Sequence, residues 1–327
     1  MRLVSFELST VTGPLTRIGA VLPDGRYADL QSAYRAVLGD NGASREGAAR
    51  LAAATIPSDM VAFIQNGTTA LDAAQSALDW VTAKDETGPD GATLVFAPGA
   101  VKLLAPVPRP PLIRDFMAFE THLKNIYPKL GREIPPQWYE LPVYYKGNPS
   151  AVGGEGDIVP MPAYATNMDF EFEFAAVIGR GGSNIQRADA LSHIYGYMIY
   201  NDFSAREIQQ REMSVGLGPA KGKDFEKGHV FGPWLVTADE IPDIYALRMQ
   251  ATVNGQPWCD TSTSTMHWRF DQMIAHASMN EMLVAGEIFG SGTVGGGSAA
   301  EVGKTLAKGD KVVLTMDRLG TLSNVIG

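Results

Sequence analysis

Residues 167–179, "NMDFEFEFAAVIG", place an acid at every second position and a phenylalanine at each position between the acids. A period of two is typical of a β-strand, because successive side chains point to opposite faces of the sheet. Asp169, Glu171 and Glu173 would therefore share one face, with the phenylalanines on the other. Like charges stacked on one strand repel each other, so three acids without a base favour a bound cation.

A hard divalent cation suits this acidic face. Mg²⁺ and Ca²⁺ take oxygen ligands, and two carboxylates two residues apart on a strand can reach one ion. The alternative is a solvated acidic face, but the apolar run "FAAVIG" that follows is unusual for an edge strand in water. Asp202 ends the apolar segment "IYGYMIYND" and would supply a third ligand, although an acid just before a helix is more often a helix cap. We interpret Asp169 as a supporting residue rather than a ligand.

The amino-acid composition is that of an ordinary globular protein. Its 327 residues are 45% hydrophobic and 19% charged, enough for one large domain and one small domain. The net charge of −9 argues against a nucleic-acid partner. A single cysteine, Cys259, excludes an internal disulfide and a cysteine-based metal site. With no targeting segment and no apolar run of about 20 residues, we expect a cytoplasmic protein without a membrane partner.

The character of the chain changes near residue 105. Residues 1–35 suggest two short strands around the turn "PDGR" and then an amphipathic helix, "YADLQSAYRAVLG". Residues 45–85 have helical spacing that breaks at Pro57 and Gly67. The prolines of "LLAPVPRPPLIRD" forbid a helix or a central strand there. We therefore predict an α/β domain over residues 1–105, which offers almost no residues for chemistry, and a second domain over residues 106–327 that holds the candidate catalytic residues.

Strands and turns dominate the second domain. Residues 247–258 contain the hairpin dipeptide Asn254-Gly255, and residues 311–324 alternate as strands do. Helices are expected in "SAREIQQRE", with Ser204 as the N-cap, and in "FDQMIAHASMNEML". The predicted fold class is α+β and mostly β.

Other polar residues are, taken one by one, weaker candidates for a role in catalysis. Asp115 and His122 lie seven residues apart in a polar stretch that follows the prolines, where an active-site loop could lie. A lone histidine is usually structural, and the other four histidines occupy ordinary contexts. Lys223 lies in the glycine-rich "GPAKGKDF", where a solvent-exposed lysine is the common case. The glycine-rich "GSGTVGGGSAAE" lacks the features of a nucleotide-binding loop.

Taken together and in order, these motifs resemble the fumarylacetoacetate hydrolase family, particularly its bacterial acylpyruvase and fumarylpyruvate hydrolase members. The resemblance covers residues 105–327, and the first hundred residues resemble the variable N-terminal domain that many members carry. It is carried by Asp115 with His122 and by "LPVYYKG", "MDFEFEFAAVIG", "YNDFSAREIQQ", "LGPAKGKDF", "GSGT" and "GDKVVL". The family fold is a mixed β-roll, usually assembled as a homodimer.

The resemblance also implies roles for individual residues. Glu171, Glu173 and Asp202, with Asp115 as a fourth acid, would bind Mg²⁺ or Mn²⁺, or Ca²⁺ as in some members. His122 matches the base that activates water, and Glu301 matches the acid that orients it. The remaining matches are Arg206, Gln209 and Lys223, which would stabilise negative charge, and Tyr145 and Thr293, which would contact the substrate.

Two departures from the family pattern leave the acyl tail of the substrate open. Met117 stands where the hydrolase that names the family has a tyrosine, and Lys124 and Lys129 are the only candidates for its basic residue after the histidine. Aromatic residues of the loop "PPQWYELPVYY" could line a pocket for the tail or pack at a dimer contact.

The implied activity is metal-dependent hydrolysis of a carbon–carbon bond in a 1,3-diketo acid, such as an acylpyruvate, fumarylacetoacetate or fumarylpyruvate, in aromatic-compound catabolism. The same scaffold hosts decarboxylases of 2-oxo diacids and isomerases, tautomerases and hydratases of related enols. The presence of both His122 and Glu301 favours hydrolysis among these. Other classes are a metal-dependent phosphatase or nuclease, the latter disfavoured by the net charge, and an inactive binding protein, disfavoured because no ligand or base is missing.

Overall fold

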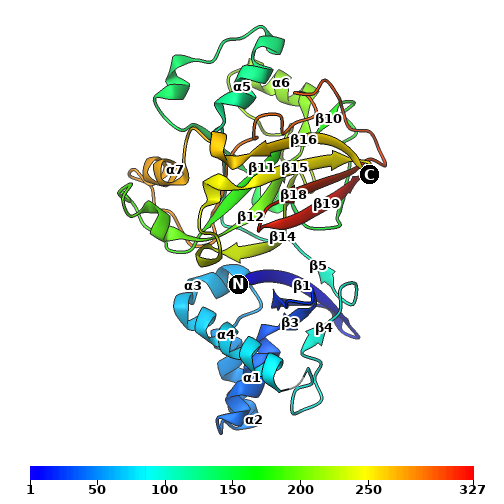
Figure 1. Cartoon of the computed structure of the whole chain (residues 1–327), viewed down its shortest axis with the longest axis vertical. Helices are drawn as coiled ribbons and strands as arrows, with labels where there is room; N and C mark the ends of the chain where they lie inside the picture. The colour runs from blue at the N-terminus through cyan, green and yellow to red at the C-terminus, as the bar shows by residue number, and fades with distance from the viewer. Residues whose placement is uncertain (85) are drawn as a thin grey trace. The chain divides into compact units, whose positions relative to one another are not determined.

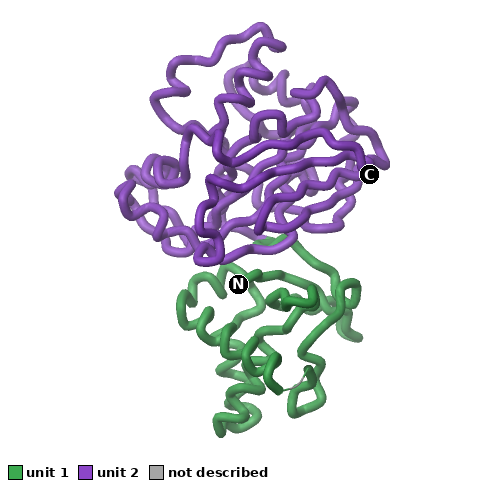
Figure 2. Tube along the Cα trace, in the orientation of Figure 1, with its two compact units in different colours: residues 1–108 green, residues 109–327 purple. Residues whose placement is uncertain are grey.

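The computed structural model describes residues 1–84 and 86–327 and divides into two compact units, Met1–Pro108 and Arg109–Gly327 (Figure 2). Whether residues 1–105 and 106–327 are separate folding domains stays a prediction. In the described part of the chain, none of the helices has the length and apolar character needed to cross a lipid bilayer.

The first unit contains an antiparallel sheet and a group of helices. In the sheet, β1 pairs with β2, β2 with β3 and β3 with β4, while β5 adds to the other side of β1. The strands are β1 (Arg2–Thr10), β2 (Gly13–Val21), β3 (Tyr27–Asp29), β4 (Val95–Phe96) and β5 (Lys102–Leu103). The helices are α1 (Leu30–Asp40), α2 (Arg45–Thr55), α3 (Met60–Gln65) and α4 (Gly67–Ala83).

The breaks expected at Pro57 and Gly67 are confirmed by the ends of α2 and α3. The helix expected from Tyr27 begins instead at Leu30, because Tyr27–Asp29 pairs with β2 as a strand. The Asp29 carboxylate then caps the helix by accepting the Ser32 N–H at 3.0 Å.

The second unit contains two larger sheets (Figure 1). One has the order β8-β14-β12-β11-β17-β6-β7, and the other has the order β16-β15-β18-β19-β9. Their strands are β6 (Ile113–Phe116), β7 (Tyr144–Gly147), β8 (Val152–Gly153), β9 (Ile158–Val159), β11 (Phe172–Ile178), β12 (Ile194–Asp202), β14 (His229–Thr237), β15 (Arg248–Val253), β16 (Gln256–Ser262), β17 (Ile288–Gly290), β18 (Lys311–Met316) and β19 (Gly320–Ile326). A short pair, β10 (Met168–Asp169) and β13 (Ser204–Ala205), and the helices α5 (Glu120–Ile126), α6 (Arg206–Ser214) and α7 (Phe270–Ala277) complete the unit.

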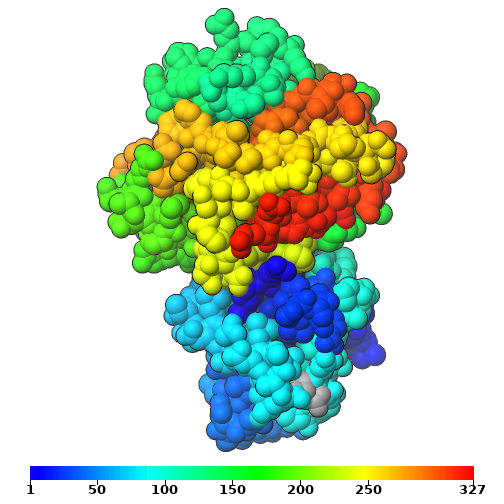
Figure 3. Space-filling view, viewed as in Figure 1, coloured from blue at the N-terminus to red at the C-terminus, as the bar shows by residue number. Residues whose placement is uncertain are grey.

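The β15–β16 hairpin confirms the predicted turn, since Asn254 and Gly255 both have positive φ, 51° and 76°. In the space-filling view its side chains (yellow) lie beside those of the C-terminal β18–β19 pair (red) on one face of the unit (Figure 3). The mixed sheets with few helices confirm the predicted fold class.

The strand expected over residues 167–179 is interrupted. Residues Met168–Asp169 pair with β13, whereas Phe172–Ile178 pair with β12 and β17, so Phe170 and Glu171 lie between two strands. Phe170, Phe172 and Phe174 are fully buried, as expected for the apolar face of the motif. The three acids of the motif are buried as well, so neither face of this segment is solvated.

The N-cap predicted at Ser204 is wrong. Ser204 belongs to β13, and its hydroxyl donates to the Asp202 carbonyl oxygen at 3.2 Å. Helix α6 begins one residue after Ala205, which has no side-chain cap. The second expected helix, α7, is shorter than predicted and ends at Ala277.

Candidate active site

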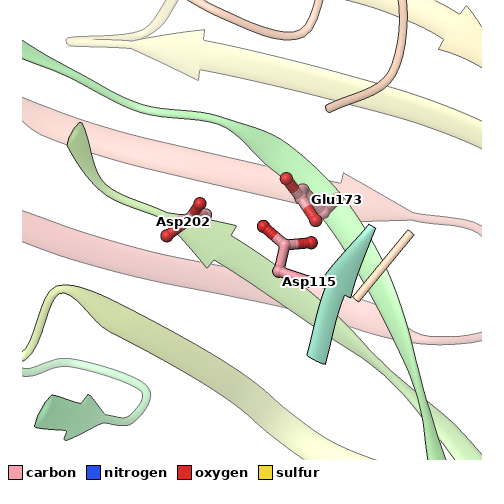
Figure 4. A group of neighbouring side chains, drawn as sticks. All are labelled: Asp115, Glu173 and Asp202. Atoms are coloured by element: carbon pink, nitrogen blue, oxygen red, sulfur yellow. The ribbon is translucent and has the colours of Figure 1, made fainter. Parts of the chain in front are cut away.

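Asp115, Glu173 and Asp202 converge from β6, β11 and β12 (Figure 4). One carboxylate oxygen of each lies within 4.8 Å of the other two, and all three side chains are buried. Strand β17 lies between β6 and β11, and its Gly290 leaves room for the acids. A Cβ at this position would collide with Asp115 Oδ1 and lie 2.9 Å from the Tyr200 ring.

The surroundings raise the pKa values of two of the three acids and lower the pKa of the third. Burial, followed by repulsion from Asp202, raises the pKa of Asp115 well above its ordinary value. Burial and repulsion from Asp115 do the same to the pKa of Glu173. Burial also opposes ionisation of Asp202, but Lys223 and His229 outweigh it and hold the pKa of Asp202 below its ordinary value. The protein alone therefore disfavours three simultaneous negative charges here.

The same donor set fits a divalent cation. Asp115 Oδ1 is buried without a hydrogen-bond donor among the described residues, and Asp202 Oδ1 has only the ion-pair contact with His229 Nδ1 at 3.3 Å. Buried oxygens that lack donors are costly unless a cation approaches them, and clustered carboxylates are the ligands that hard divalent ions prefer. The chemistry of the group does not distinguish one such ion from another.

Glu171 is not part of this three-acid group. Its Oε1 accepts from Arg206 Nη2 at 2.7 Å, and its Oε2 pairs with Lys223. Burial opposes its ionisation, but Arg206 and Lys223 outweigh burial and lower the pKa of Glu171 to about 2. Its role as a metal ligand stays a prediction.

Arg206, at the start of α6, connects the acidic motif to the helix. It donates to Asp169 Oδ2 at 2.8 and 2.6 Å and to Gln209 Oε1 at 3.1 Å. Asp169 also accepts the backbone N–H groups of Ala299 and Ala300. These contacts suit a supporting residue, and its role relative to a metal stays a prediction. The structure thus brings Arg206 and Gln209 together beside Glu171.

Lys223 is 1% exposed and forms ion pairs with Glu171 and Asp202. The Tyr145 hydroxyl donates to Asp202 Oδ2 at 2.8 Å. The Thr293 hydroxyl lies 3.5 Å from Glu173 Oε1. The structure therefore places Lys223, Tyr145 and Thr293 in contact with the acids, and a role of Tyr145 and Thr293 in substrate binding stays a prediction.

His122 and Glu301 form a hydrogen-bonded pair. His122 Nδ1 lies 2.9 Å from Glu301 Oε2, and its Nε2 lies 4.0 Å from Glu171 Oε1. Burial opposes ionisation of Glu301, but His122 and other donors outweigh it and lower the pKa of Glu301. An ionised Glu301 accepts a hydrogen bond from Nδ1–H, and this tautomer leaves the lone pair of Nε2 free on the side of Glu171.

His229 is a residue of the site that the sequence interpretation missed. It is fully buried opposite Asp202 in the β12–β14 pair, with Nδ1 3.3 Å from Asp202 Oδ1 and 2.8 Å from the Tyr200 hydroxyl. Its Nε2 lies 3.0 Å from Asp224 Oδ1. Burial lowers its pKa, but the two aspartates outweigh burial and raise the pKa of His229 to about 9. The available signal was its position at the head of the apolar segment "HVFGPWLV".

Residues 112–327 match the family of the fumarylacetoacetate (FAA) hydrolase C-terminal domain. The chain belongs to this family. It is 30% identical over 315 residues to the oxaloacetate tautomerase YisK of Bacillus subtilis, covering 95% of this chain and 96% of the relative. It is also 30% identical over 328 residues to the mitochondrial oxaloacetate tautomerase fahd2 of Xenopus laevis, covering 100% of this chain and 90% of the relative.

Several solved structures have the same fold as this chain. The fumarylacetoacetate hydrolase of Exiguobacterium antarcticum superposes with a TM-score of 0.71 at 21% identity, covering 99% of both chains. The maleylpyruvate hydrolase of Sphingobium sp. SYK-6 superposes with a TM-score of 0.70 at 22% identity, covering 100% of both chains. The family and fold that the motifs implied are confirmed.

Proposed function

We propose that this enzyme is a divalent-metal-dependent tautomerase that interconverts the keto and enol forms of a 2-oxo diacid such as oxaloacetate. The observation that carries the proposal is the near full-length similarity to proteins named oxaloacetate tautomerases. These relatives favour the isomerase alternative over the carbon–carbon hydrolase that the sequence analysis preferred.

The charges of the site support a metal-dependent reaction of an acidic substrate. Asp115, Glu173 and Asp202, with Glu171 as a predicted further ligand, would hold the cation, which would supply electrophilic stabilisation to a 2-oxo group. When all four acids are ionised they outnumber the nearby cations Lys223, Arg206 and His229, so a dianion would be repelled unless a divalent ion offset their charge. A structure of the Sphingobium maleylpyruvate hydrolase in complex with manganese(II) and pyruvate supports Mn²⁺ as the first ion to test.

The reaction also needs a group that moves one proton. Ketonisation adds a proton to C3 as the O–H bond of the enol breaks, and enolisation reverses both changes. His122 is the proposed group, because Nδ1 is held by Glu301 and Nε2 lies 4.0 Å from Glu171 Oε1. Lys223 and Arg206 add positive charge where negative charge develops on the substrate oxygen.

Hydrolysis of an acylpyruvate is the second candidate. The specific observation in its favour is the 2.9 Å contact between His122 and Glu301, since an oriented imidazole can take a proton from water as readily as from carbon. The two activities would use the same acids and the same histidine.

The test compares three reactions of two substrates, oxaloacetate and an acylpyruvate, with the same enzyme preparation. With Mn²⁺ or Mg²⁺, we expect the decay of enol-oxaloacetate absorbance to exceed the spontaneous rate, and we expect EDTA to abolish the difference. Release of pyruvate and a carboxylic acid from an acylpyruvate would establish the hydrolase instead. Release of CO₂ from oxaloacetate would establish a decarboxylase. A rate equal to the spontaneous rate in every case would refute the proposal.

A further inference from the structure

The segment Gly218–Asp224 follows α6 and supplies two residues to the site. Lys223 pairs with Glu171 and Asp202, and Asp224 accepts from His229 and from the Asn148 backbone N–H. The placement of both side chains therefore depends on the turn that precedes them.

Glu212, in the last turn of α6, binds that turn directly. Its carboxylate accepts the N–H groups of three successive residues, Ala220 at 3.0 Å, Lys221 at 2.7 Å and Gly222 at 3.2 Å. We propose that Glu212 is a positioning residue that fixes this turn and thereby holds Lys223 between Glu171 and Asp202. The effect expected on the reaction rate rests on the proposed function, whereas the effect on the turn does not.

The turn has few other means to satisfy these groups. Successive N–H groups that point the same way form a concave site of positive potential that requires an acceptor. The carbonyl oxygen of Ala220 is already used, because it accepts the N–H groups of both Lys223 and Asp224 at 2.9 and 2.7 Å. Glu212 supplies a charged acceptor, whose hydrogen bonds are stronger than those of a neutral group.

The turn also packs directly against α6. A Cβ on Gly222 would lie only 2.6 Å from Gln209 Cβ, so the glycine backbone rests directly on the helix. The Gly222 carbonyl oxygen accepts the Ala205 N–H at 2.8 Å, next to the start of α6. The turn thus contacts α6 at two places, through Gly222 near the start of the helix and through Glu212 near its end. The helix between these contacts carries Arg206 and Gln209.

The first readout is amide hydrogen exchange, which needs no substrate. In the full-length protein, Glu212→Gln keeps the shape of the side chain but removes its charge. We expect exchange of the 220–222 amides to accelerate about tenfold or more, while amides of β11 and β12 keep their rates. The matched control, Glu226→Gln, changes an exposed acid three residues beyond Lys223 and should leave the turn unchanged. Unchanged exchange of residues 220–222 in Glu212→Gln would overturn the proposal.

The second readout is the rate with enol-oxaloacetate. A displaced Lys223 should lower kcat roughly tenfold with little change in KM, because misplacement of a catalytic group by a fraction of an ångström has effects of this order. In a Lys223→Met background the same Glu212→Gln change should lower kcat less than about twofold. Equal losses in both backgrounds would show a general structural role and contradict the proposal. A wild-type enzyme without tautomerase activity would refute the proposed function, while the exchange result would still decide the role of Glu212.

Discussion

Lys223 is the buried cation on which the charge balance of the acids depends most directly. Its ammonium group is paired with Glu171 and Asp202, and these acids raise the pKa of Lys223 above its ordinary value despite the opposing effect of burial. We predict that Lys223→Met lowers kcat about a hundredfold or more, because one aimed donor typically contributes this much to a rate. The measurement is steady-state kinetics with enol-oxaloacetate and Mn²⁺.

The control for this variant is Lys221→Met, which removes the same charge from an exposed position two residues earlier in the turn. It should leave kcat within about twofold of the wild type, since an exposed charge is screened by solvent. Similar losses in the two variants would mean that the effect of Lys223 comes from net charge alone.

Cys259 provides a second prediction for a single residue. It is buried in β16, and burial, followed by repulsion from Glu301 and Asp260, raises the pKa of its thiol to about 12. Because the thiolate is the reactive form, we predict that a disulfide reagent at mildly alkaline pH labels the native protein roughly a hundredfold more slowly than the unfolded protein. Labelling of the native protein at the unfolded rate would show that β16 opens readily.

Among the strands, β17 makes the site possible by carrying no side chain at Gly290. We predict that Gly290→Ala displaces Asp115, because the added Cβ would collide with its Oδ1 and crowd the Tyr200 ring. The expected results are a Kd for Mn²⁺ weakened about tenfold or more and a loss of stability of about 1–3 kcal/mol from overpacking. Titration calorimetry and urea unfolding measure the two effects.

Gly182→Ala is the matched control for the strand variant. A Cβ at Gly182 would meet its nearest neighbour, on Ile185, at an ordinary contact distance of 3.4 Å. This variant should bind Mn²⁺ as the wild type does. Weakened binding in both variants would contradict the steric explanation.

In helix α1, a glycine-to-alanine substitution should stabilise the protein. Gly39 lies in its last turn, and a Cβ there would meet no atom within 4 Å. We predict that Gly39→Ala raises the free energy of unfolding by about 0.5–1 kcal/mol, because alanine restricts the unfolded chain more than glycine does. Urea unfolding of the variant checks this, and a loss of stability would show that the end of α1 needs the freedom of glycine.

Local patterns predicted the elements well but not their partners. The alternation of acids and phenylalanines indicated buried strand structure, and Asn254-Gly255 indicated a hairpin. The break at Phe170–Glu171 was not predictable, because it arises where β10 leaves to pair with β13, more than thirty residues away in the chain. His229 was missed for the same reason, since only the register of β14 on β12 brings it opposite Asp202. The alternation of acids pointed to Glu173, and the position of Asp202 at the end of an apolar strand made it a candidate third ligand, whereas Asp115 was placed near them only through the family resemblance.

For the whole molecule, the buried acids would couple the binding of a cation to folding. The chain has a net charge of −9, and the Asp115–Glu173–Asp202 group adds repulsion that a bound divalent ion would relieve. Any ion that binds the folded chain and not the unfolded chain stabilises it by mass action. Stability should therefore depend on pH and on the cation together.

We predict that, in EDTA, the free energy of unfolding falls as pH rises from about 5 to about 8. The pKa values of Asp115 and Glu173 are higher in the folded chain than their ordinary values, so the folded state binds more protons in this window and loses stability as they dissociate. His229, with a pKa of about 9, acts in the same direction. Glu171 and Asp202 have lowered pKa values, so their opposite contribution is lost only on acidification below about pH 4.

Saturating Mg²⁺ should flatten this dependence, because the cation takes the place of the protons on the acids. Urea unfolding at three pH values, with EDTA and with Mg²⁺, measures both slopes, and we expect them to differ by at least about 1 kcal/mol across the window. Asp115→Asn removes one of the titrating carboxyls and should reduce the slope in EDTA without a cation. If the slopes in EDTA and in Mg²⁺ coincide, these acids do not bind the ion in the folded protein, and the metal-dependent function proposed for the site would have to be abandoned.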